Sequence, residues 1–380
     1  MTDPTETCNK MDEPDAEYEE FIQKHPPPNV DWSNGPLCKL IGQAMVEEAA
    51  RSHSIPPASV KQLETTFRAS DGAQLRAKIY QPADILSGPA GRGYPLVVLI
   101  HGGGFCVGVP ENEEITARNV VQTYGVIAIS LDYRHAPEYK FPYAVDDAWD
   151  GLQWAARNAA SYGADPTKGF IVGGSSAGGN LSAVMAHLAR DQGLHPPLTG
   201  QYLAIPSVGT EEEIPAKYQD RLKSYSKYAD SPSLSVAAIN SVLRLYEPDV
   251  KDGSRFCIIN HPKGHADIPS AYFQIAGGDT LRDQGLVYET VLREEYGIPT
   301  KLDVYPGLPH GFWSGFPTLS ASKVFRRDQV RGFGWLLNLE PDAEKLQSLE
   351  YDRVVSIRWS TKLWILWVVL KDKLTSLWAS

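Results

Sequence analysis

A serine nucleophile is indicated by the segment Gly174-Ser175-Ser176-Ala177-Gly178, which has the spacing G-x-S-x-G. Of the two serines, only Ser176 has a glycine both two residues before and two residues after it. This spacing suits a strained turn between a strand and a helix, where larger neighbours would collide with the sheet. We therefore predict Ser176 as the nucleophile. A chain with 32 glycines can produce this motif by chance, so the prediction needs support from other residues.

A second glycine-rich segment, His101-Gly102-Gly103-Gly104-Phe105, directly follows an apolar run. Glycines after a buried strand allow backbone N–H groups to point into a cavity and hold the negative oxygen of a tetrahedral intermediate. No Lys-Ser or Lys-Thr follows these glycines, which excludes a phosphate-binding P-loop. We expect His101 to orient the loop. The predicted oxyanion-hole donors are the N–H groups of Gly103, Gly104 and Ala177.

A serine hydroxyl becomes a good nucleophile when a base takes its proton and an acid orients that base. Of the histidines after Ser176, only His310 follows a late predicted strand within a Gly- and Pro-rich loop. The acid is expected just after the preceding strand, where Asp279 lies. Asp283 is the alternative acid, one turn further from the end of that strand. The resulting chain order, Ser-Asp-His, is the one that accompanies a nucleophile on a strand-to-helix elbow.

Short apolar runs that alternate with helical stretches must position these residues. Such runs are typical of strands buried on both faces, so we predict an α/β fold, with a mostly parallel central sheet and helices on both of its faces. A helix over 36–52 and a hairpin that turns at Asp71-Gly72 are expected before this region. The predicted strands are 95–100, 126–131, 169–173, 201–205, 271–276 and 301–305, and the predicted helices are 142–160, 177–191, 284–296 and 321–338.

One long segment, 209–265, interrupts the alternation and is rich in Tyr, Ser and Lys. An insertion of this length is too long for a plain connection and indicates a cap over the sheet, with a helix near 235–246. The predicted organisation is a disordered acidic arm with a Pro-rich linker (1–30), amino-terminal cap helices (31–60), a catalytic domain that includes the cap insertion (61–340) and a carboxy-terminal extension (341–380).

The formal net charge is −10, of which the first 20 residues contribute −7 through eight acids and one lysine. The rest of the chain carries no basic stripe, which argues against nucleic-acid binding. Four cysteines match no metal-ligand or redox spacing and are expected to be free thiols in a reducing compartment. The amino terminus lacks the pattern of a secretory signal, so we expect an intracellular, cytoplasmic location. No metal or organic cofactor is expected.

An apolar segment at 363–370 lies between Lys362 and Lys371. It is too short to cross a bilayer, which requires about 20 residues. Apolar residues recur there at helical spacing with basic residues between them. A helix packed on the protein's own body and a membrane-surface contact through residues 359–378 both remain open.

Five segments together resemble the hormone-sensitive-lipase-like branch of the α/β-hydrolases, especially its fungal intracellular esterases. They span about residues 60–340. The resemblance implies a triad of Ser176, Asp279 and His310, the oxyanion donors named above, and a helical cap. The five segments are HGGGF at 101–105, DYRHAPE at 132–138, GGSSAGGN at 173–180, GDTLRD at 278–283 and HGF at 310–312.

The resemblance also implies an activity: a serine carboxylesterase that forms an acyl-enzyme on short-to-medium acyl esters of a small molecule. The fungal resemblance suggests a role in secondary-metabolite (toxin) biosynthesis. Two alternatives remain open. One is a related acyl hydrolase, such as a deacetylase, lactonase or amidase, and the other is a non-catalytic small-molecule binding module on the same fold.

The chain departs from the family pattern at three positions without a predicted catalytic role. Ser175 stands where the family often has Asp, Thr280 replaces a usual Pro, and His135 stands where Leu is common. These departures bear on substrate range. A structural ion-pair network is expected for Asp132, Arg134 and Glu138.

Overall fold

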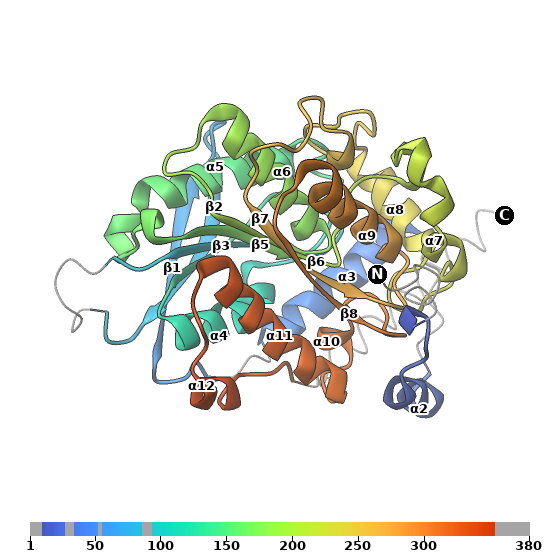
Figure 1. Cartoon of the computed structure of the whole chain (residues 1–380), viewed down its shortest axis with the longest axis horizontal. Coiled ribbons are helices and arrows are strands. Elements are labelled where there is room, and N and C mark those ends of the chain that lie inside the picture. The colour runs from blue at the N-terminus through green and yellow to red at the C-terminus, as the bar shows by residue number, and fades with distance from the viewer. Residues whose placement is uncertain (1–9, 27–33, 52–54, 86–92, 354–380) are drawn as a thin grey trace.

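A central eight-stranded sheet forms the core of the structure, a computed structural model that describes residues 10–26, 34–51, 55–85 and 93–353 (Figure 1). The strand order is β1-β2-β4-β3-β5-β6-β7-β8. β2 pairs antiparallel with both β1 and β4, and the remaining pairs are parallel. The strands are β1 (Val60–Arg68), β2 (Gln74–Pro82), β3 (Leu96–Ile100), β4 (Ile127–Leu131), β5 (Phe170–Ser175), β6 (Gly200–Ala204), β7 (Ser270–Ala276) and β8 (Thr300–Tyr305).

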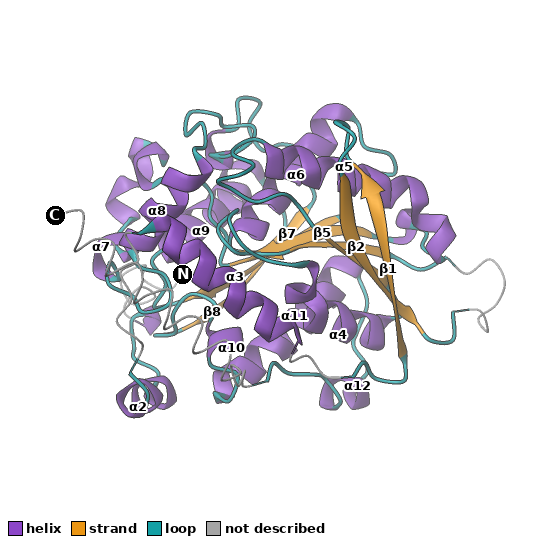
Figure 2. Ribbon diagram, turned by 180° about the vertical axis from the view of Figure 1, so that it is seen from behind, coloured by secondary structure: helices purple, strands orange, loops and turns teal. Residues whose placement is uncertain are grey.

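Helices cover both faces of the sheet (Figures 1 and 2). One face carries α5 (Tyr143–Asn158), α6 (Ala177–Gln192) and α9 (Arg282–Thr290), which a π-helical turn at Val291–Glu295 extends. The other face carries α4 (Glu114–Tyr124) and α11 (Ser320–Leu337). Because no face of β3, β4 or β6 meets water, every residue of these strands is buried. The predicted α/β fold with a mostly parallel sheet is therefore confirmed.

The remaining helices are short or lie outside the two layers. They are α2 (Ala16–Lys24), α3 (Gly35–Arg51), α7 (Ser224–Lys227), α8 (Val236–Tyr246), α10 (Phe312–Gly315) and α12 (Ala343–Gln347). Single 3₁₀ turns lie at Pro110–Glu113, Ala159–Tyr162, Pro166–Lys168, Glu211–Glu213, Ala216–Arg221 and Ile258–Asn260.

The sequence analysis did not predict α4, a helix that buries charged residues as well as apolar ones. Glu114 and Arg118 are both buried and form an ion pair with each other. Arg118 also reaches Glu350, at 3.1 Å, in the segment that follows α12. A helix whose buried charges pair with each other and with neighbouring segments has no continuous polar face for a sequence pattern to detect.

The amino-terminal residues 10–26 are folded, so the predicted disordered arm over 1–30 is wrong for this stretch. Asp15 caps α2 by accepting a hydrogen bond from the backbone N–H of Tyr18, at 2.8 Å. Tyr18 is buried and meets the ring of Phe316 edge to face, with 5.1 Å between centroids. The acids predicted to lie in a disordered arm here include a helix cap, Asp15, and an ion-pair partner, Asp12. Residues 1–9 and 27–33 lie outside the described residues.

Two segments predicted as parts of the cap lie against each other. The α3 and α8 helices are in contact, and the Leu245 side chain approaches the backbone of Gly35 closely. Both helices contribute to the wall of the pocket described below. No described helix is long and apolar enough to cross a membrane. The apolar segment 363–370, and with it the predicted membrane contact through 359–378, lies outside the described residues.

Candidate active site

Ser176 lies on a sharp turn between β5 and α6. Its backbone has φ +56° and ψ −117°, a strained combination for a residue with a side chain. A Cβ atom at Gly174 or Gly178 would lie 2.1 or 2.0 Å from the carbonyl oxygen of Ile100. Only glycine fits at these two positions, so the predicted reason for the G-x-S-x-G spacing holds in the structure. The turn presents the Ser176 hydroxyl at the carboxyl end of the parallel strands.

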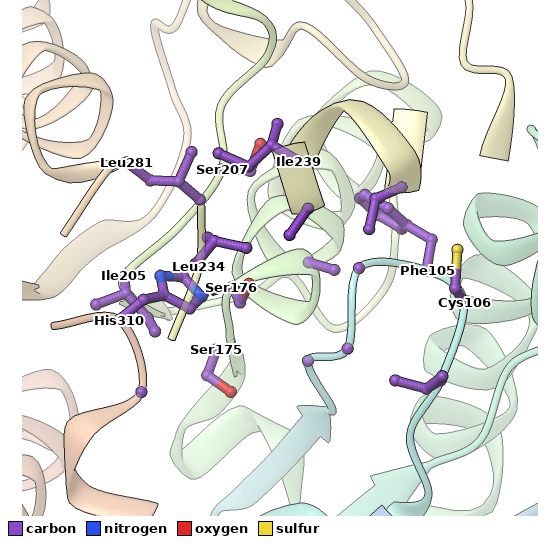
Figure 3. A pocket seen from close by; sticks show the side chains of 18 of the residues that line it. Phe105, Cys106, Ser175, Ser176, Ile205, Ser207, Leu234, Ile239, Leu281 and His310 are labelled. Carbon is purple, nitrogen blue, oxygen red and sulfur yellow. Dashed lines mark hydrogen bonds between the residues drawn. The ribbon is translucent and has the colours of Figure 1, made fainter. Parts of the chain in front are cut away.

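A chain of hydrogen bonds joins the three residues predicted as a triad. Nε2 of His310 lies 2.9 Å from Oγ of Ser176, and Nδ1 of His310 lies 2.7 Å from Oδ2 of Asp279. Asp279 is fully buried, and its other oxygen accepts the backbone N–H of Leu281, at 2.9 Å. This fixed carboxylate can orient the imidazole, whose other nitrogen then faces the serine hydroxyl. Figure 3 shows His310 and Ser176 facing each other.

The alternative acid, Asp283, does not face His310. Its Oδ2 accepts the backbone N–H groups of Lys223 and Ser224, each at 2.7 Å, and its Oδ1 pairs with Arg282. Asp283 therefore ties α9 to the segment around α7. This geometry favours Asp279 as the acid, as the distance from the strand end predicted.

The loop after β3 lies beside Ser176 and has the backbone of a glycine-only segment. Gly103 has φ +120° and Gly104 has φ +60°. A Cβ atom at Gly103 would lie 2.0 Å from the carbonyl oxygen of Val107, and one at Gly104 would lie 2.8 Å from the Val242 side chain. Gly103, Gly104 and Ala177 line the same pocket as Ser176. The structure thus brings the three predicted oxyanion donors to the nucleophile.

A cavity of about 510 Å³ lies above Ser176. This volume is in the range of pockets that enclose small-molecule ligands. Its lining comes from α3, α8, the loop after β3 and the loops that carry the triad. In Figure 3, Leu234, Ile239 and Leu281 surround the space next to Ser176 and His310. Further apolar side chains in the lining are Val46, Val107, Val242, Leu245 and Trp313.

The sequence did not identify Glu113 as a residue of the site. Glu113 is 5% exposed and accepts hydrogen bonds from Ser175 Oγ at 3.0 Å and Thr116 Oγ1 at 3.1 Å. Burial raises the pKa of the Glu113 carboxyl, and the nearby Arg326 partly opposes this shift. The bond to Glu113 turns the Ser175 hydroxyl away from His310, which leaves Ser176 as the serine that the base can reach. The two residues are 62 positions apart in the chain, so no local sequence signal could have identified Glu113.

The predicted ion-pair network of Asp132, Arg134 and Glu138 is not a network among these three residues. Arg134 pairs instead with Asp147 at 2.6 Å and Asp71 at 2.7 Å. Glu138 pairs with Lys39 from α3. Asp132 lies beside His101, with 3.7 Å between Nε2 and Oδ1. Each residue anchors the segment after β4 to a different element, which residue type alone could not specify.

Two of the four cysteines can be compared with the prediction of free thiols. Cys106 and Cys257 are free and buried, as predicted. The side chains of Cys8 and Cys38 are outside the described part of the molecule.

Among the described residues, one group could hold a metal ion, namely His101, Asp132 and His135. This group does not line the pocket.

Comparison with known proteins agrees with this fold. A family model described as the alpha/beta hydrolase fold matches residues 97–314. An AB hydrolase superfamily protein of Schizosaccharomyces pombe is 31% identical over 335 residues, which cover 87% of this chain and 96% of that protein. The versiconal hemiacetal acetate esterase of Dothistroma septosporum is 30% identical over 245 residues, or 64% of this chain and 74% of the esterase.

Solved structures give the same result. A vibralactone cyclase superposes with a TM-score of 0.77 at 29% identity, covering 87% of this chain and 96% of the cyclase. A bacterial heroin esterase superposes with a TM-score of 0.70 at 26% identity, covering 87% of this chain and 99% of that esterase. The chain therefore belongs to the α/β-hydrolases, in their hormone-sensitive-lipase-like branch.

Proposed function

We propose that the protein is a serine carboxylesterase that cleaves short-to-medium acyl esters of a small molecule through an acyl-enzyme on Ser176. It is a hydrolase that acts on ester bonds. The observation that carries the finer proposal is the hydrogen-bonded chain from Ser176 Oγ through His310 to Asp279, at 2.9 and 2.7 Å, beneath an apolar cavity. The base is thus within hydrogen-bonding distance of both the nucleophile and the orienting acid.

The proposed mechanism follows from these contacts. Neutral His310 accepts the Ser176 proton at Nε2 while Oγ attacks the ester carbonyl carbon. Asp279 accepts the Nδ1 proton in a hydrogen bond and stabilises the imidazolium that forms. The N–H groups of Gly103, Gly104 and Ala177 bind the oxyanion, and His310 then protonates the departing alkoxide. Water repeats the sequence on the acyl-enzyme and releases the acid.

The pocket supports a limit on substrate size. A cavity of about 510 Å³ holds a drug-sized ligand rather than a long-chain triglyceride. Its apolar wall suits a hydrocarbon acyl group or an aromatic alcohol. A secondary-metabolite ester is proposed as the natural substrate, because one relative carries the name versiconal hemiacetal acetate esterase.

A series of nitrophenyl esters with two to sixteen acyl carbons tests the proposal. We expect a burst of nitrophenol followed by steady turnover, with kcat/KM highest for short and medium chains. Ser176→Ala should abolish the burst, while Ser175→Ala should retain it. Absence of nitrophenol release by the wild-type protein, or undiminished release by Ser176→Ala, would refute the mechanism.

A second candidate is attack of an internal hydroxyl, rather than water, on the same acyl-enzyme, which would form a lactone. It is favoured by the similarity to a solved vibralactone cyclase. Mass analysis of the products from a hydroxyacyl nitrophenyl ester separates the two outcomes, because the lactone is 18 Da lighter than the hydroxy acid. A non-catalytic binding module, another alternative that the sequence leaves open, would release no nitrophenol at all.

A further inference from the structure

A cluster of three side chains outside the pocket has the composition of a metal site. His101 follows β3, while Asp132 and His135 follow the adjacent strand β4. One potential ligand atom of each residue lies within 4.8 Å of those of the other two. The distance from His101 Nε2 to Asp132 Oδ1 is 3.7 Å. Tetrahedral zinc with bonds of 2.0–2.1 Å would hold its ligands about 3.3 Å apart, so this pair needs only a small contraction.

The two imidazole rings give independent evidence for a metal ion. Within the described part of the chain, neither Nε2 of His101 nor Nε2 of His135 has a hydrogen-bond partner, although both atoms are buried. The whole His101 residue has 0% exposure. Buried ring nitrogens are rarely left unpaired, because they lose their bonds to water without replacement. A cation that binds such nitrogens would replace the lost bonds.

The hydrogen bond made by the His101 ring is typical of a histidine that binds a metal ion. Its Nδ1 lies 2.8 Å from the carbonyl oxygen of Gly102, which can only accept a hydrogen bond. Nδ1 therefore donates a hydrogen bond to this oxygen, which leaves Nε2 as the ring atom that can bind a cation. A ligating histidine commonly donates its other N–H to a backbone carbonyl in this way.

The charge around the cluster also suits a cation. Asp132 supplies a negative charge. Lys39, which lies close to His135, is paired with Glu138, and this pairing offsets its positive charge.

We propose that His101, Asp132 and His135 bind a divalent transition-metal ion such as Zn²⁺, with a fourth position left for water. The site is distinct from the esterase centre and takes no part in the proposed chemistry. Its occupation would tie the ends of β3 and β4 together. It would also fix the His101 ring, around which the oxyanion loop folds: a Cβ atom at Gly108 would lie only 2.1 Å from Nδ1 of His101.

Cobalt titration of the full-length protein, after treatment with a chelator, tests the site. Co²⁺ in a tetrahedral site gives visible absorption bands, and competition by Zn²⁺ reports the zinc affinity. We expect about one equivalent of cobalt to bind. His135→Leu fills a similar volume without a ligand, and Asp132→Asn keeps the shape while removing the charge. Each should weaken binding by more than about 10-fold, since even residues that only support a ligand contribute about 10–100-fold.

Two control variants locate the binding. His25→Leu removes an exposed histidine, and His310→Gln removes the histidine of the proposed triad; both should retain wild-type affinity. Zinc at about 100 times its Kd should raise the unfolding temperature of the wild-type protein by about 2–8 °C and leave His135→Leu unchanged. Lack of stoichiometric binding, equal affinity in His135→Leu and Asp132→Asn, or loss of binding in His310→Gln would overturn the proposal.

Discussion

The hydroxyl of Ser175 donates a hydrogen bond to the buried carboxyl group of Glu113, with 3.0 Å between the two oxygens. Ser175 ends β5, directly before the proposed nucleophile, while Glu113 lies at the end of the 3₁₀ turn Pro110–Glu113. This bond connects the nucleophile turn to the segment that leads into α4. It also occupies the only other hydroxyl on the turn.

A carboxylate introduced at position 175 would face Glu113. We predict that Ser175→Asp lowers the free energy of unfolding by about 2–4 kcal/mol at neutral pH, because two carboxyl groups would then share one buried site. Glu113→Gln removes one of the charges, so the double variant should recover most of the loss. Urea unfolding of the four proteins in a double-mutant cycle measures the coupling. Additive effects of the two changes would contradict the direct contact.

The two oxyanion-loop glycines should respond differently to alanine. The Cβ atom of Gly103→Ala would meet a backbone carbonyl oxygen that cannot retreat, so kcat should fall by at least about 10²-fold, the cost of a lost oxyanion donor. Gly104→Ala meets the Val242 side chain instead. Adding Val242→Ala should therefore restore part of the activity of Gly104→Ala but none of that of Gly103→Ala. Equal rescue of both variants in steady-state kinetics would show that the two clashes are misassigned.

A buried histidine pair predicts the acid sensitivity of the fold. Nε2 of His187 lies 2.9 Å from Nδ1 of His265. Burial lowers the pKa of His187 well below its usual value and that of His265 to about 4. The unfolded chain, with histidine pKa values near 6.5, binds more protons than the folded protein below that pH. Stability is therefore complete above about pH 6.5 and is lost as the pH falls towards 4, by up to about 1.4 kcal/mol per pH unit for each histidine.

Urea unfolding between pH 7.5 and 4.5 measures this slope. His187→Gln keeps a polar side chain but removes one titrating group, so its slope should be smaller by about 1 kcal/mol per pH unit. His25→Gln, at an exposed position, is the matched control and should keep the wild-type slope. An unchanged slope in His187→Gln would show that this histidine does not determine the acid response.

The folded amino-terminal segment should stabilise the loop that carries Asp279. Asp12 pairs with the buried Arg282, at 2.6 Å, and Arg282 also donates to the carbonyl oxygen of Gly277, at 2.9 Å. Asp12→Ala would leave the guanidinium without this partner, and we predict a loss of about 1–3 kcal/mol in unfolding free energy. Glu20→Ala alters an exposed ion pair of α2 and should leave the unfolding free energy nearly unchanged. Equal small effects of both substitutions would mean that residues 10–26 contribute little to the fold.

Sequence patterns were most informative where one physical constraint dominates. Strands β3 to β7 were predicted because strands buried on both faces need continuous apolar runs. Ser176 was selected over Ser175 because Gly174 and Gly178 press against the carbonyl oxygen of Ile100. Asp279 was preferred to Asp283 because side chains at strand ends meet at the same edge of a parallel sheet.

The failures arose where tertiary contacts decide the role of a polar residue. Because Glu113 and Ser175 are far apart in the chain, no local sequence pattern indicates that they are in contact. The acidic residues near the amino terminus suggested disorder, yet Asp12 and Asp15 find an arginine and a helix end as partners. Arg134 was expected to pair with its sequence neighbours but pairs with Asp147 and Asp71. In each case the partner is supplied by the fold.

Covalent labelling tests the central claim most directly. Treatment with a fluorophosphonate, followed by peptide mass spectrometry, reports which side chain acts as a nucleophile. We predict a single adduct on Ser176 in the wild-type protein and in Ser175→Ala, no adduct in Ser176→Ala, and labelling slowed by at least about 10³-fold in His310→Gln. An adduct on Ser175, or undiminished labelling of Ser176→Ala, would contradict the account.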